Sequence, residues 1–343
     1  MTIALFLGVL FATMVVGVPI AFSLLLTALA LMVQLDFFDA QLLAQNTQAG
    51  FDSFPLLAVP FFILAGELMN AGGLSRRIID LARTFVGHVE GGLGYVAIAA
   101  SLMLASMSGS AIADTAALAT LLLPMMRRQN YPDGARAGLI GAGGIIAPIV
   151  PPSMPMVIYG VTTNTSISKL FLAGIVPGIL MAVALVFVWR GVAKSKALPV
   201  AEKASWAERR RALVTSAWAL GLPVIIIGGL RAGLFTPTEA AVVAAVYALL
   251  VATLVYRELN LAGIYRVFVA ASRTTGVVMF LCGAATAASY MITLADLPSQ
   301  LAQSMGPLLH SPLLFMTVVC LFLLAVGMVM DLTPTILILG PVL

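Results

Sequence analysis

Two aspartates, Asp114 and Asp331, stand inside long apolar stretches of this 343-residue sequence. An ionised carboxylate at the centre of a bilayer costs several kcal/mol unless it is paired, so an aspartate in such a place is a functional candidate. Neither stretch contains a basic residue that would pair with its aspartate. A bound cation would supply the missing positive charge. The alternative is that each carboxylate only caps the start of a helix.

Oxygen-bearing side chains surround the first aspartate. The segment Ser106-Met-Ser-Gly-Ser-Ala-Ile-Ala-Asp-Thr115 is rich in small and hydroxyl residues, which would interrupt a helix at membrane depth. Hydroxyl groups and freed backbone carbonyls offer the oxygen ligands that suit a coupling cation such as Na⁺. The candidate sodium- and substrate-binding residues of this segment are Ser106, Ser108, Gly109, Ser110, Asp114 and Thr115.

A second interrupted segment reads Gly141-Ala-Gly-Gly-Ile-Ile-Ala-Pro-Ile-Val-Pro-Pro-Ser-Met-Pro155. Four prolines and a glycine pair within fifteen residues are incompatible with a continuous helix. The pattern predicts a membrane span that is broken near the midplane and exposes backbone carbonyls. The alternative is a structural helix with a kink. The candidate binding residues here are Gly143, Gly144, Pro148, Pro152 and Ser153.

A third segment, Met330-Asp-Leu-Thr-Pro-Thr-Ile-Leu-Ile-Leu-Gly-Pro341, matches the stretch from Ala113 to Pro124. In both stretches an aspartate precedes an apolar run, and a proline follows ten residues after the aspartate. This internal match predicts that the chain contains two related halves. The candidate binding residues of this segment are Met330, Asp331, Thr333, Pro334 and Thr335.

The composition places all of these residues in a membrane protein. Hydrophobic residues make up 61% of the chain and charged residues 9%, and the mean hydropathy is +1.09. Soluble domains are about 45–50% apolar and about 25% charged. A soluble enzyme, a nucleic-acid-binding protein and a secreted disulfide scaffold are therefore excluded. The chain is predicted to be an all-α polytopic membrane protein.

Candidate spans follow from apolar runs of about 20 residues. We expect ordinary spans at 3–33 (one long helix or two short helices that meet at Pro19), 55–71, 168–191, 214–235, 237–256 and 273–294. The stretch 74–86 carries charges on an otherwise apolar helical pattern, which suits an amphipathic helix in the membrane interface. Segment 297–309 is expected to be its counterpart in the second half.

The basic residues predict the orientation of the spans. If the basic segment 190–211 lies in the cytoplasm, sixteen of the eighteen lysines and arginines fall on that side, and only Lys169 and Arg231 do not. Both ends of the segment 92–126 are then cytoplasmic, which predicts a re-entrant helical hairpin with a polar tip. The alternative is two ordinary spans joined by an outer polar loop, which would reverse the side of every later loop.

On this topology the hairpin 312–343 enters from the opposite side. Two related halves of opposite orientation form an inverted repeat, an architecture of secondary transporters with a site between the halves. The first repeat is predicted to cover 1–193, with the arm 74–86, the re-entrant hairpin 92–126 and the broken helix 135–160. A basic cytoplasmic loop is predicted at 194–213. The second repeat is predicted to cover 214–343, with scaffold helices at 214–256, the helix 273–294, the arm 297–309 and the hairpin 312–343.

These features favour cation-coupled uptake of an organic anion. Half-helices whose N-termini point at the midplane would attract a carboxylate substrate. Each charge that crosses with the membrane field gains about 2.3 kcal/mol per 100 mV. The alternative within this class is a proton-coupled transporter in which Asp114 and Asp331 bind H⁺.

An intramembrane aspartyl protease also requires two aspartates in the membrane. Such enzymes resemble one another in a Tyr-Asp and a Gly-x-Gly-Asp pair, whereas here Ala113 and Met330 precede the aspartates. A rhomboid-type serine protease needs Gly-x-Ser-x-Gly with a histidine nearby, and Ser110 lacks that flank. A purely structural subunit has no need for two polar intramembrane tips. We therefore expect a transporter and no enzymatic activity.

The motifs resemble the large membrane subunit of tripartite ATP-independent periplasmic (TRAP) transporters, the DctM-like permeases, over essentially the whole chain. The resemblance is carried by the segments Ser108–Thr115, Gly143–Ser153, Gly233–Ala241 and Met330–Thr335. It implies a multi-pass protein of the bacterial inner membrane with a sodium-driven elevator mechanism. It also implies two partners, a small membrane subunit and a periplasmic substrate-binding protein. The implied substrates are organic acids. The residues of the motifs are most similar to those of family members that handle sugar-derived keto acids such as diketogulonate.

The end of the sequence departs from that family pattern. The family continues with a second broken span that would match 141–155 and with a final helix, whereas this sequence stops at Leu343, inside the return arm of the second hairpin. A chain end at that depth would be poorly placed. We therefore expect a truncated sequence, and expect that such a fragment would not transport alone.

Three features are expected to be structural. Thr236-Pro-Thr-Glu239 is the pattern of a capping box with proline at the first helical position. Cys282 and Cys320 are predicted to be buried free thiols rather than disulfide or metal-binding residues. The two histidines of the chain have no partner at the spacing of metal ligands.

Overall fold

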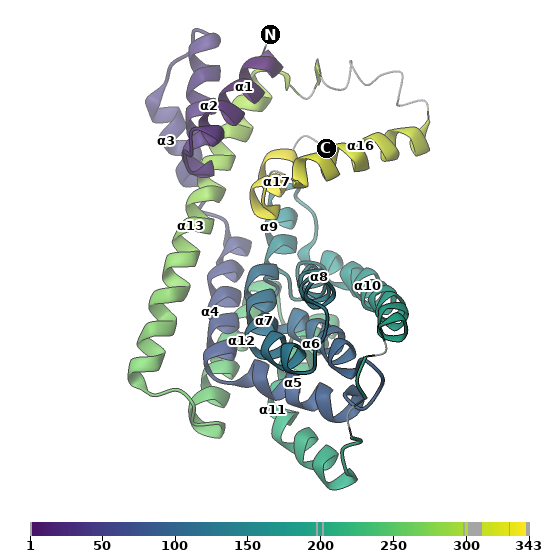
Figure 1. The fold of residues 1–343 in the computed structure, drawn as a ribbon. Helices are drawn as coiled ribbons and strands as arrows, with labels where there is room; N and C mark the ends of the chain where they lie inside the picture. The colour runs from purple at the N-terminus through teal and green to yellow at the C-terminus, as the bar shows by residue number, and fades with distance from the viewer. Residues whose placement is uncertain are drawn as a thin grey trace. The chain divides into compact units, whose positions relative to one another are not determined.

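The computed structural model describes residues 2–196, 198–200, 202–297, 299–300, 311–328 and 330–340. All regular secondary structure in these residues is helical, which confirms the predicted all-α class (Figure 1). The chain forms two compact units that interleave along the sequence. The first comprises Met1–Leu56, Val161–Thr165 and Thr275–Leu343, and the second comprises Leu57–Gly160 and Ser166–Thr274.

Five helices among the described residues are long and apolar enough to cross a membrane. They are the short helix η1 (Phe54–Leu57) running into α4 (Ala58–Ala71), α10 (Ile167–Ser195), α11 (Trp206–Arg231), α12 (Pro237–Leu250) continued by the π-helical turn η2 (Val251–Val255), and α13 (Leu261–Leu294). Each corresponds to a predicted span. The polytopic membrane class is therefore confirmed.

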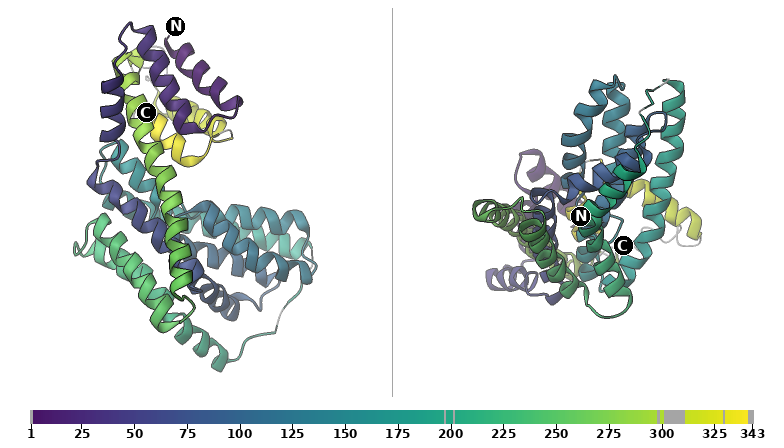
Figure 2. Two further views of the ribbon diagram at one scale, coloured as in Figure 1. Left: turned by 90° about the vertical axis from the view of Figure 1, so that its left-hand side faces the viewer. Right: turned by 90° about the horizontal axis from the view of Figure 1, so that it is seen from below.

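The apolar region 3–33 forms two helices, so the choice left open at Pro19 is resolved in favour of two short helices. These are α1 (Thr2–Val15) and α2 (Ile20–Gln34), which pack against each other and lie side by side in Figure 2. Pro19 is the residue just before α2, where a proline cannot continue the preceding helix. The helix α3 (Ala40–Ala49) follows, with the Asp39 carboxylate accepting a hydrogen bond from the Leu42 amide at 3.0 Å.

Two helices begin earlier than hydropathy predicted. Helix α11 begins at Trp206 rather than 214, because Ser205 and Glu208 form a capping box ahead of the charged first turns. Helix α13 begins at Leu261 rather than 273, with the Asn260 side chain accepting from the Gly263 amide at 2.8 Å. Arginines lower the hydropathy of these turns, but they are good helix formers.

The core of the second unit holds α4 and α12 in close contact. Helix α12 buries a row of small residues, namely Ala240, Ala241, Ala244, Ala245 and Ala248. Small side chains let two helix backbones approach closely, which strengthens packing in a membrane. The capping box predicted at the start of α12 is confirmed, since Thr236 accepts from the Glu239 amide and the Glu239 carboxylate accepts from the Thr236 amide at 2.8 Å.

Replacing Thr236 by alanine is expected to lower the stability of the purified protein by about 1 kcal/mol, because the Glu239 amide loses the hydroxyl that accepts its hydrogen bond, and the Glu239 carboxylate loses the hydroxyl that donates to it. The measurement is the thermal unfolding midpoint in detergent. Thr274→Ala is the matched control, since the Thr274 hydroxyl is exposed and bonds only to the Ala270 carbonyl of its own helix. An equal change in the two variants would contradict the role of the cap.

Trp189 of α10 anchors the start of helix α6 (Gly92–Ser108). Its indole N–H donates to the Gly91 carbonyl at 2.9 Å, and its ring stacks on Tyr131 with the centroids 6.0 Å apart. Trp189 is buried, and its ring lies directly against Gly94. A Cβ atom on Gly94 would overlap that ring. The sequence therefore needs glycine at position 94 for α6 and α10 to pack.

We expect Gly94→Ala to destabilise the protein by about 1–3 kcal/mol, the usual range for overpacking, despite the better helix propensity of alanine. Gly191→Ala is the control, because a Cβ atom there meets nothing within 4 Å. Thermal unfolding of both variants checks the prediction. Destabilisation by Gly191→Ala of the same size would show that the Trp189 contact is not the cause.

Candidate functional site

The segment around Asp114 is a helical hairpin with a sharp tip. Helix α6 ends at Ser108, helix α7 (Ala111–Arg128) begins two residues after Gly109, and the two helices pack on each other. Gly109 has φ 61°, a left-handed conformation that glycine adopts without strain. Ser110 is the N-cap of α7, and its hydroxyl accepts from the Ala113 amide at 3.3 Å. The predicted break in the apolar segment is confirmed.

The helix is interrupted at the glycine- and proline-rich segment, as predicted. Helix α8 (Asp133–Gly144) ends at the glycine pair and α9 (Met154–Thr162) begins two residues after the pair Pro151–Pro152, so the alternative of one kinked helix is wrong. The bond between Pro151 and Pro152 is cis. Prolines carry no N–H, so the carbonyls that a helix would have bonded to those groups are released. One of them, the Pro148 carbonyl, accepts from the buried Ser153 hydroxyl at 2.5 Å.

The hairpin tip lies against this break. A Cβ atom on Gly109 would be 2.5 Å from the Pro152 carbonyl oxygen and 2.9 Å from the Ser153 Cα. Only glycine allows the two irregular backbone segments to approach so closely. The structure thus brings two sequence-predicted segments together, Ser106–Thr115 and Gly143–Ser153.

Helix α8 packs on both arms of the hairpin through its glycine pair. A Cβ atom on Gly143 would overlap the Ser101 hydroxyl of α6, and one on Gly144 would overlap the Thr115 hydroxyl of α7. In contrast, Gly141 on the same helix has nothing within 4 Å of its Cβ position. The two glycines therefore set the distance between the broken helix and the first turn of α7, where Asp114 lies.

Asp114 is 2% exposed, although an aspartate is almost never fully buried without a compensating interaction. It lies in the first turn of α7, four residues after the N-cap. The N-cap is Ser110, so Asp114 is not the N-cap residue of α7. The positive end of the helix dipole favours an ionised carboxylate in this turn. The Asp114 carboxylate and the hydroxyls and carbonyls of the two adjoining segments are the kinds of oxygen ligand that suit a hard cation.

Ser106 and Ser108 are the other two serines predicted as ligands in this segment. The Ser106 hydroxyl donates to the Met103 carbonyl at 2.7 Å, which leaves its oxygen able to accept or to coordinate. The side chain of Ser108 lies outside the described residues. Across the part of the chain that the structure describes, no group of three or more His, Cys, Asp and Glu side chains gathers as a transition-metal site would require.

Asp331 lies in the first of the two compact units. Helix α16 (Pro312–Gly327) and helix α17 (Leu332–Leu339) pack on each other, so this segment is also interrupted before a second helix. Asp331 is the N-cap residue of α17, but its side chain makes no capping hydrogen bond, and it is exposed within the described chain. The Thr335 hydroxyl donates to the Asp331 carbonyl at 2.8 Å.

The two aspartate segments differ in register. Asp331 occupies the N-cap, the position that Ser110 holds in the first hairpin, whereas Asp114 lies one turn into its helix. Met330 and Pro334 are buried, and Thr333 is half-buried. Pro341 and most of the predicted arm 297–309 lie outside the described residues. The structure therefore places Met330, Asp331, Thr333, Pro334 and Thr335 around one helix start.

Ser101 is a candidate that sequence reasoning missed. It is buried in α6, its hydroxyl donates to the Ala97 carbonyl at 2.8 Å, and it lies against Gly143. The available signal is a hydroxyl residue flanked on both sides by apolar residues of the same helix. The prediction for the cysteines is correct in part. Both are free, as predicted, but only Cys282 is buried. Cys320 is exposed on α16, an apolar helix that has no buried residues within the described chain.

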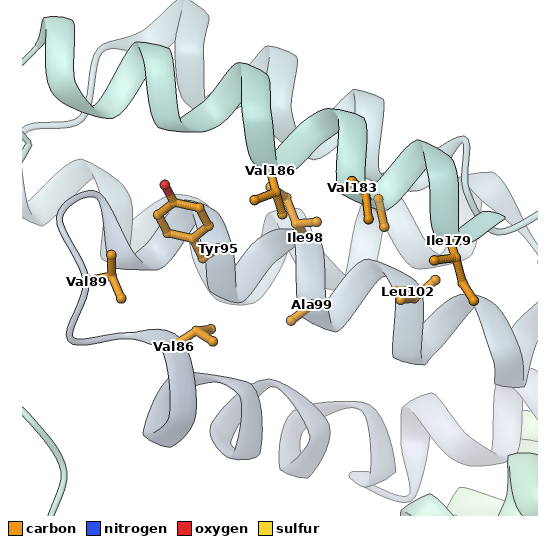
Figure 3. A pocket seen from close by; sticks show the side chains of 10 residues that line it. Val86, Val89, Tyr95, Ile98, Ala99, Leu102, Ile179, Val183 and Val186 are labelled. Carbon is orange, nitrogen blue, oxygen red and sulfur yellow. The ribbon is translucent and has the colours of Figure 1, made fainter. Parts of the chain in front are cut away.

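An apolar cleft of about 400 Å³ lies between α6, α10 and the end of α5 (Leu74–Val86), the helix predicted for the interface (Figure 3). Its lining side chains are Val86, Val89, Tyr95, Ile98, Ala99, Leu102, Ile179, Ala182, Val183 and Val186. The Tyr95 hydroxyl is the only polar side-chain group among them. A cleft without charged groups is unsuited to a carboxylate. It is therefore not the candidate site.

Comparison with known proteins identifies the family. Residues 7–343 match the family described as "Tripartite ATP-independent periplasmic transporter, DctM component". The 2,3-diketo-L-gulonate TRAP transporter large permease protein of Escherichia coli is 55% identical over 343 residues, covering 100% of this chain and 81% of that protein.

Two more distant relatives carry other organic acids in their names. The sialic acid TRAP transporter large permease protein of Vibrio cholerae is 41% identical over 337 residues, covering 98% of this chain and 78% of that protein. The C4-dicarboxylate TRAP transporter large permease protein of Rhodobacter capsulatus is 34% identical over an alignment of 357 positions, covering 100% of this chain and 81% of that protein.

Proposed function

The chain belongs to the DctM family of TRAP transporter large permease subunits, and from this premise we propose that it imports an organic acid together with Na⁺. Members of this family are transporter subunits of the bacterial inner membrane rather than enzymes, and they work with a small membrane subunit and a periplasmic binding protein. The observation that carries the proposal is the buried Asp114 at a hairpin tip that meets a broken helix.

The energy source follows from the family's own description as ATP-independent. Concentrative uptake of an anion against a negative interior requires a coupled cation. A single positive charge that moves inward contributes about 2.3 kcal/mol per 100 mV. In this proposal Asp114 supplies the negative charge for such a cation, and the hydroxyls and released carbonyls of the hairpin tip and of the broken helix supply neutral oxygen ligands. Na⁺ prefers oxygen ligands, and the candidate ligands are those of the two segments Ser106–Thr115 and Gly143–Ser153.

Asp331 is proposed to serve a second cation or the substrate at the corresponding segment Met330–Thr335. Its carboxylate is not used by the α17 cap, so it is available as a ligand. The start of α17 also offers amide groups and a positive dipole end, which attract a carboxylate. We propose that the two hairpins are re-entrant and belong to oppositely oriented repeats.

The movement is proposed to be of the elevator type. The hairpin helices α6 and α7 and the broken helix α8 pack on one another, and α6 also packs on α5, on α10 and on α4, along which the group would slide. This group is suited to move as one body. The helices α4, α11 and α12 form a second packed group that would remain fixed as the scaffold.

The substrate is proposed to be a sugar-derived keto acid. This assignment rests on the relative that is 55% identical and named for 2,3-diketo-L-gulonate. The test is uptake of labelled 2,3-diketo-L-gulonate by proteoliposomes that contain the permease chain and the small subunit, with the cognate binding protein outside. We expect uptake only when all three proteins are present. Uptake of sialic acid or of a C4-dicarboxylate instead would contradict the substrate assignment but not the transport function.

A further inference from the structure

The arm helix α5 is held by the helices that are proposed as the scaffold. Arg77 of α5 forms an ion pair with Glu258 at 2.6 Å, and its Cζ lies 3.7 Å from the centroid of the Tyr256 ring. Tyr256 and Glu258 follow the π-helical turn η2 at the end of α12. The Arg77 carbonyl also accepts from the Ser216 hydroxyl of α11 at 2.8 Å. These contacts fix the first turns of α5 to α11 and to the end of α12.

The far end of α5 also lies against the scaffold. The Cζ atom of Arg209 in α11 is 5.8 Å from the centroid of the Phe85 ring, within the range of a cation–π contact. Helix α5 ends one residue later, at Val86, and residues 87–90 lead to α6 without helical structure of their own. They begin with Gly87, and glycine restricts the backbone least. Contacts at both ends therefore attach α5 to the fixed group of helices.

Gly91, the next residue, is attached to the other group. Its carbonyl accepts from the Trp189 indole of α10, and its amide donates at 3.3 Å to the carbonyl of Pro199 in the segment that follows α10. A Cβ atom on Gly91 would lie 2.8 Å from the Cβ atom of Ala193, which is also in α10. Helix α10 packs on α6 and α8 of the moving group. The connection between fixed and moving helices is therefore confined to residues 87–90.

The apolar cleft of about 400 Å³ lies at this connection (Figure 3). Val86 and Val89 line it from the end of α5 and from the connecting residues, and its other lining side chains come from α6 and α10. The cleft therefore lies between the end of the fixed arm and two helices of the moving group. Proteins pack densely and leave few spaces larger than a water molecule. A space of this size at the boundary between two groups of helices therefore needs an explanation.

Two alanines keep the cleft open. Ala99 of α6 and Ala182 of α10 line it among larger apolar side chains. A longer apolar side chain at either position would fill part of the space, bury more apolar surface and add packing contacts. The sequence has the small alanine side chain at both positions, so the space is kept at a cost in packing.

We propose that the cleft is the clearance for the transport movement: residues 87–90 act as the hinge, and α6 and α10 approach the end of α5 in one of the two end states. This inference rests on the elevator movement proposed above. Hinges are a few residues that absorb a change in φ and ψ between packed elements. Apart from the Tyr95 hydroxyl, the side chains that line the cleft carry no polar group, so its closure requires no desolvation of other polar side chains.

The test is to fill the cleft and to measure uptake of labelled 2,3-diketo-L-gulonate under a Na⁺ gradient, in proteoliposomes with the permease, its small subunit and the binding protein. Ala99→Phe is expected to lower the initial rate about tenfold, because the ring blocks the approach of α6 to the end of α5. The unfolding midpoint in detergent is expected to stay the same or to rise, since filling a cavity usually stabilises a protein. Ala99→Leu fills less of the space and is expected to lower the rate by less, and it replaces the phenylalanine variant if that variant does not fold.

Ala184→Phe is the matched control, because Ala184 is an exposed residue of α10 that does not line the cleft. It is expected to transport at the normal rate. Normal uptake by the folded Ala99 variants would overturn the inference and leave the proposed function intact. A fall in the unfolding midpoint that accompanies the loss of uptake in both Ala99 variants would assign the effect to packing and would also overturn it. If the unchanged protein shows no Na⁺-driven uptake, the proposed function is wrong, and the inference fails with it.

Discussion

Replacement of Asp114 by asparagine is expected to abolish sodium-driven accumulation of substrate. The side chain keeps its shape but loses the charge that would balance a bound Na⁺. Each coupled charge contributes about 2.3 kcal/mol per 100 mV, which corresponds to about a 50-fold accumulation ratio. Loss of this contribution is expected to reduce the steady-state uptake to that of protein-free vesicles. The measurement is substrate accumulation in proteoliposomes under an imposed Na⁺ gradient and membrane potential.

Asp133→Asn is the matched control for this experiment. Asp133 lies in the first turn of α8, as Asp114 lies in the first turn of α7, but its side chain is exposed and pairs only with Arg136 one turn away. Exposed ion pairs contribute about 0–1 kcal/mol. Its variant is expected to transport at the normal rate. Normal accumulation by Asp114→Asn, with correctly folded protein, would remove Asp114 from the coupling site.

The second large effect is expected from Gly144→Ala. The added methyl group would overlap the Thr115 hydroxyl and lie 3.2 Å from the Ala111 carbonyl, so α8 and the first turn of α7 must move apart. Overpacking of this kind costs about 1–3 kcal/mol, and it would also displace the turn that holds Asp114. We therefore expect uptake to be lost and the unfolding midpoint to fall.

Gly141→Ala separates the contact from the simple loss of a glycine. Both residues lie in α8, but a Cβ atom on Gly141 meets nothing within 4 Å. This variant is expected to retain full uptake, with unchanged or slightly higher stability because alanine is the better helix former. If Gly144→Ala retains full uptake as well, the distance between the broken helix and the hairpin does not matter for transport.

Much of the fold could be predicted from the sequence, because the determining signals are local. Apolar runs gave the spans, and glycine and proline positions gave the breaks at Gly109 and after Gly144. The capping box at the start of α12 could be predicted from the four residues 236–239 alone. The starts of α11 and α13 were missed, because hydropathy penalises arginine at positions where helix propensity and a side-chain cap favour a helix.

The site was less predictable, because its geometry depends on contacts that are distant in sequence. The meeting of Gly109 with Pro152 and of Gly144 with Thr115 could not be deduced from spacing. The two aspartates match in sequence, and yet Asp331 lies at an N-cap and Asp114 one turn further into its helix. Exposure of Cys320 was also missed, since an apolar stretch predicts burial without distinguishing burial in protein from a surface that faces lipid.

The central claim is that Na⁺ drives the uptake of an organic acid. The most direct measurement compares proteoliposomes that carry the permease, its small subunit and the binding protein under either an inward Na⁺ gradient or an inward pH gradient, at the same membrane potential. Sodium coupling predicts accumulation with the Na⁺ gradient, none with the pH gradient alone, and none in Asp331→Ala under either. Accumulation driven by the pH gradient without Na⁺ would contradict it and would make the two aspartates proton carriers.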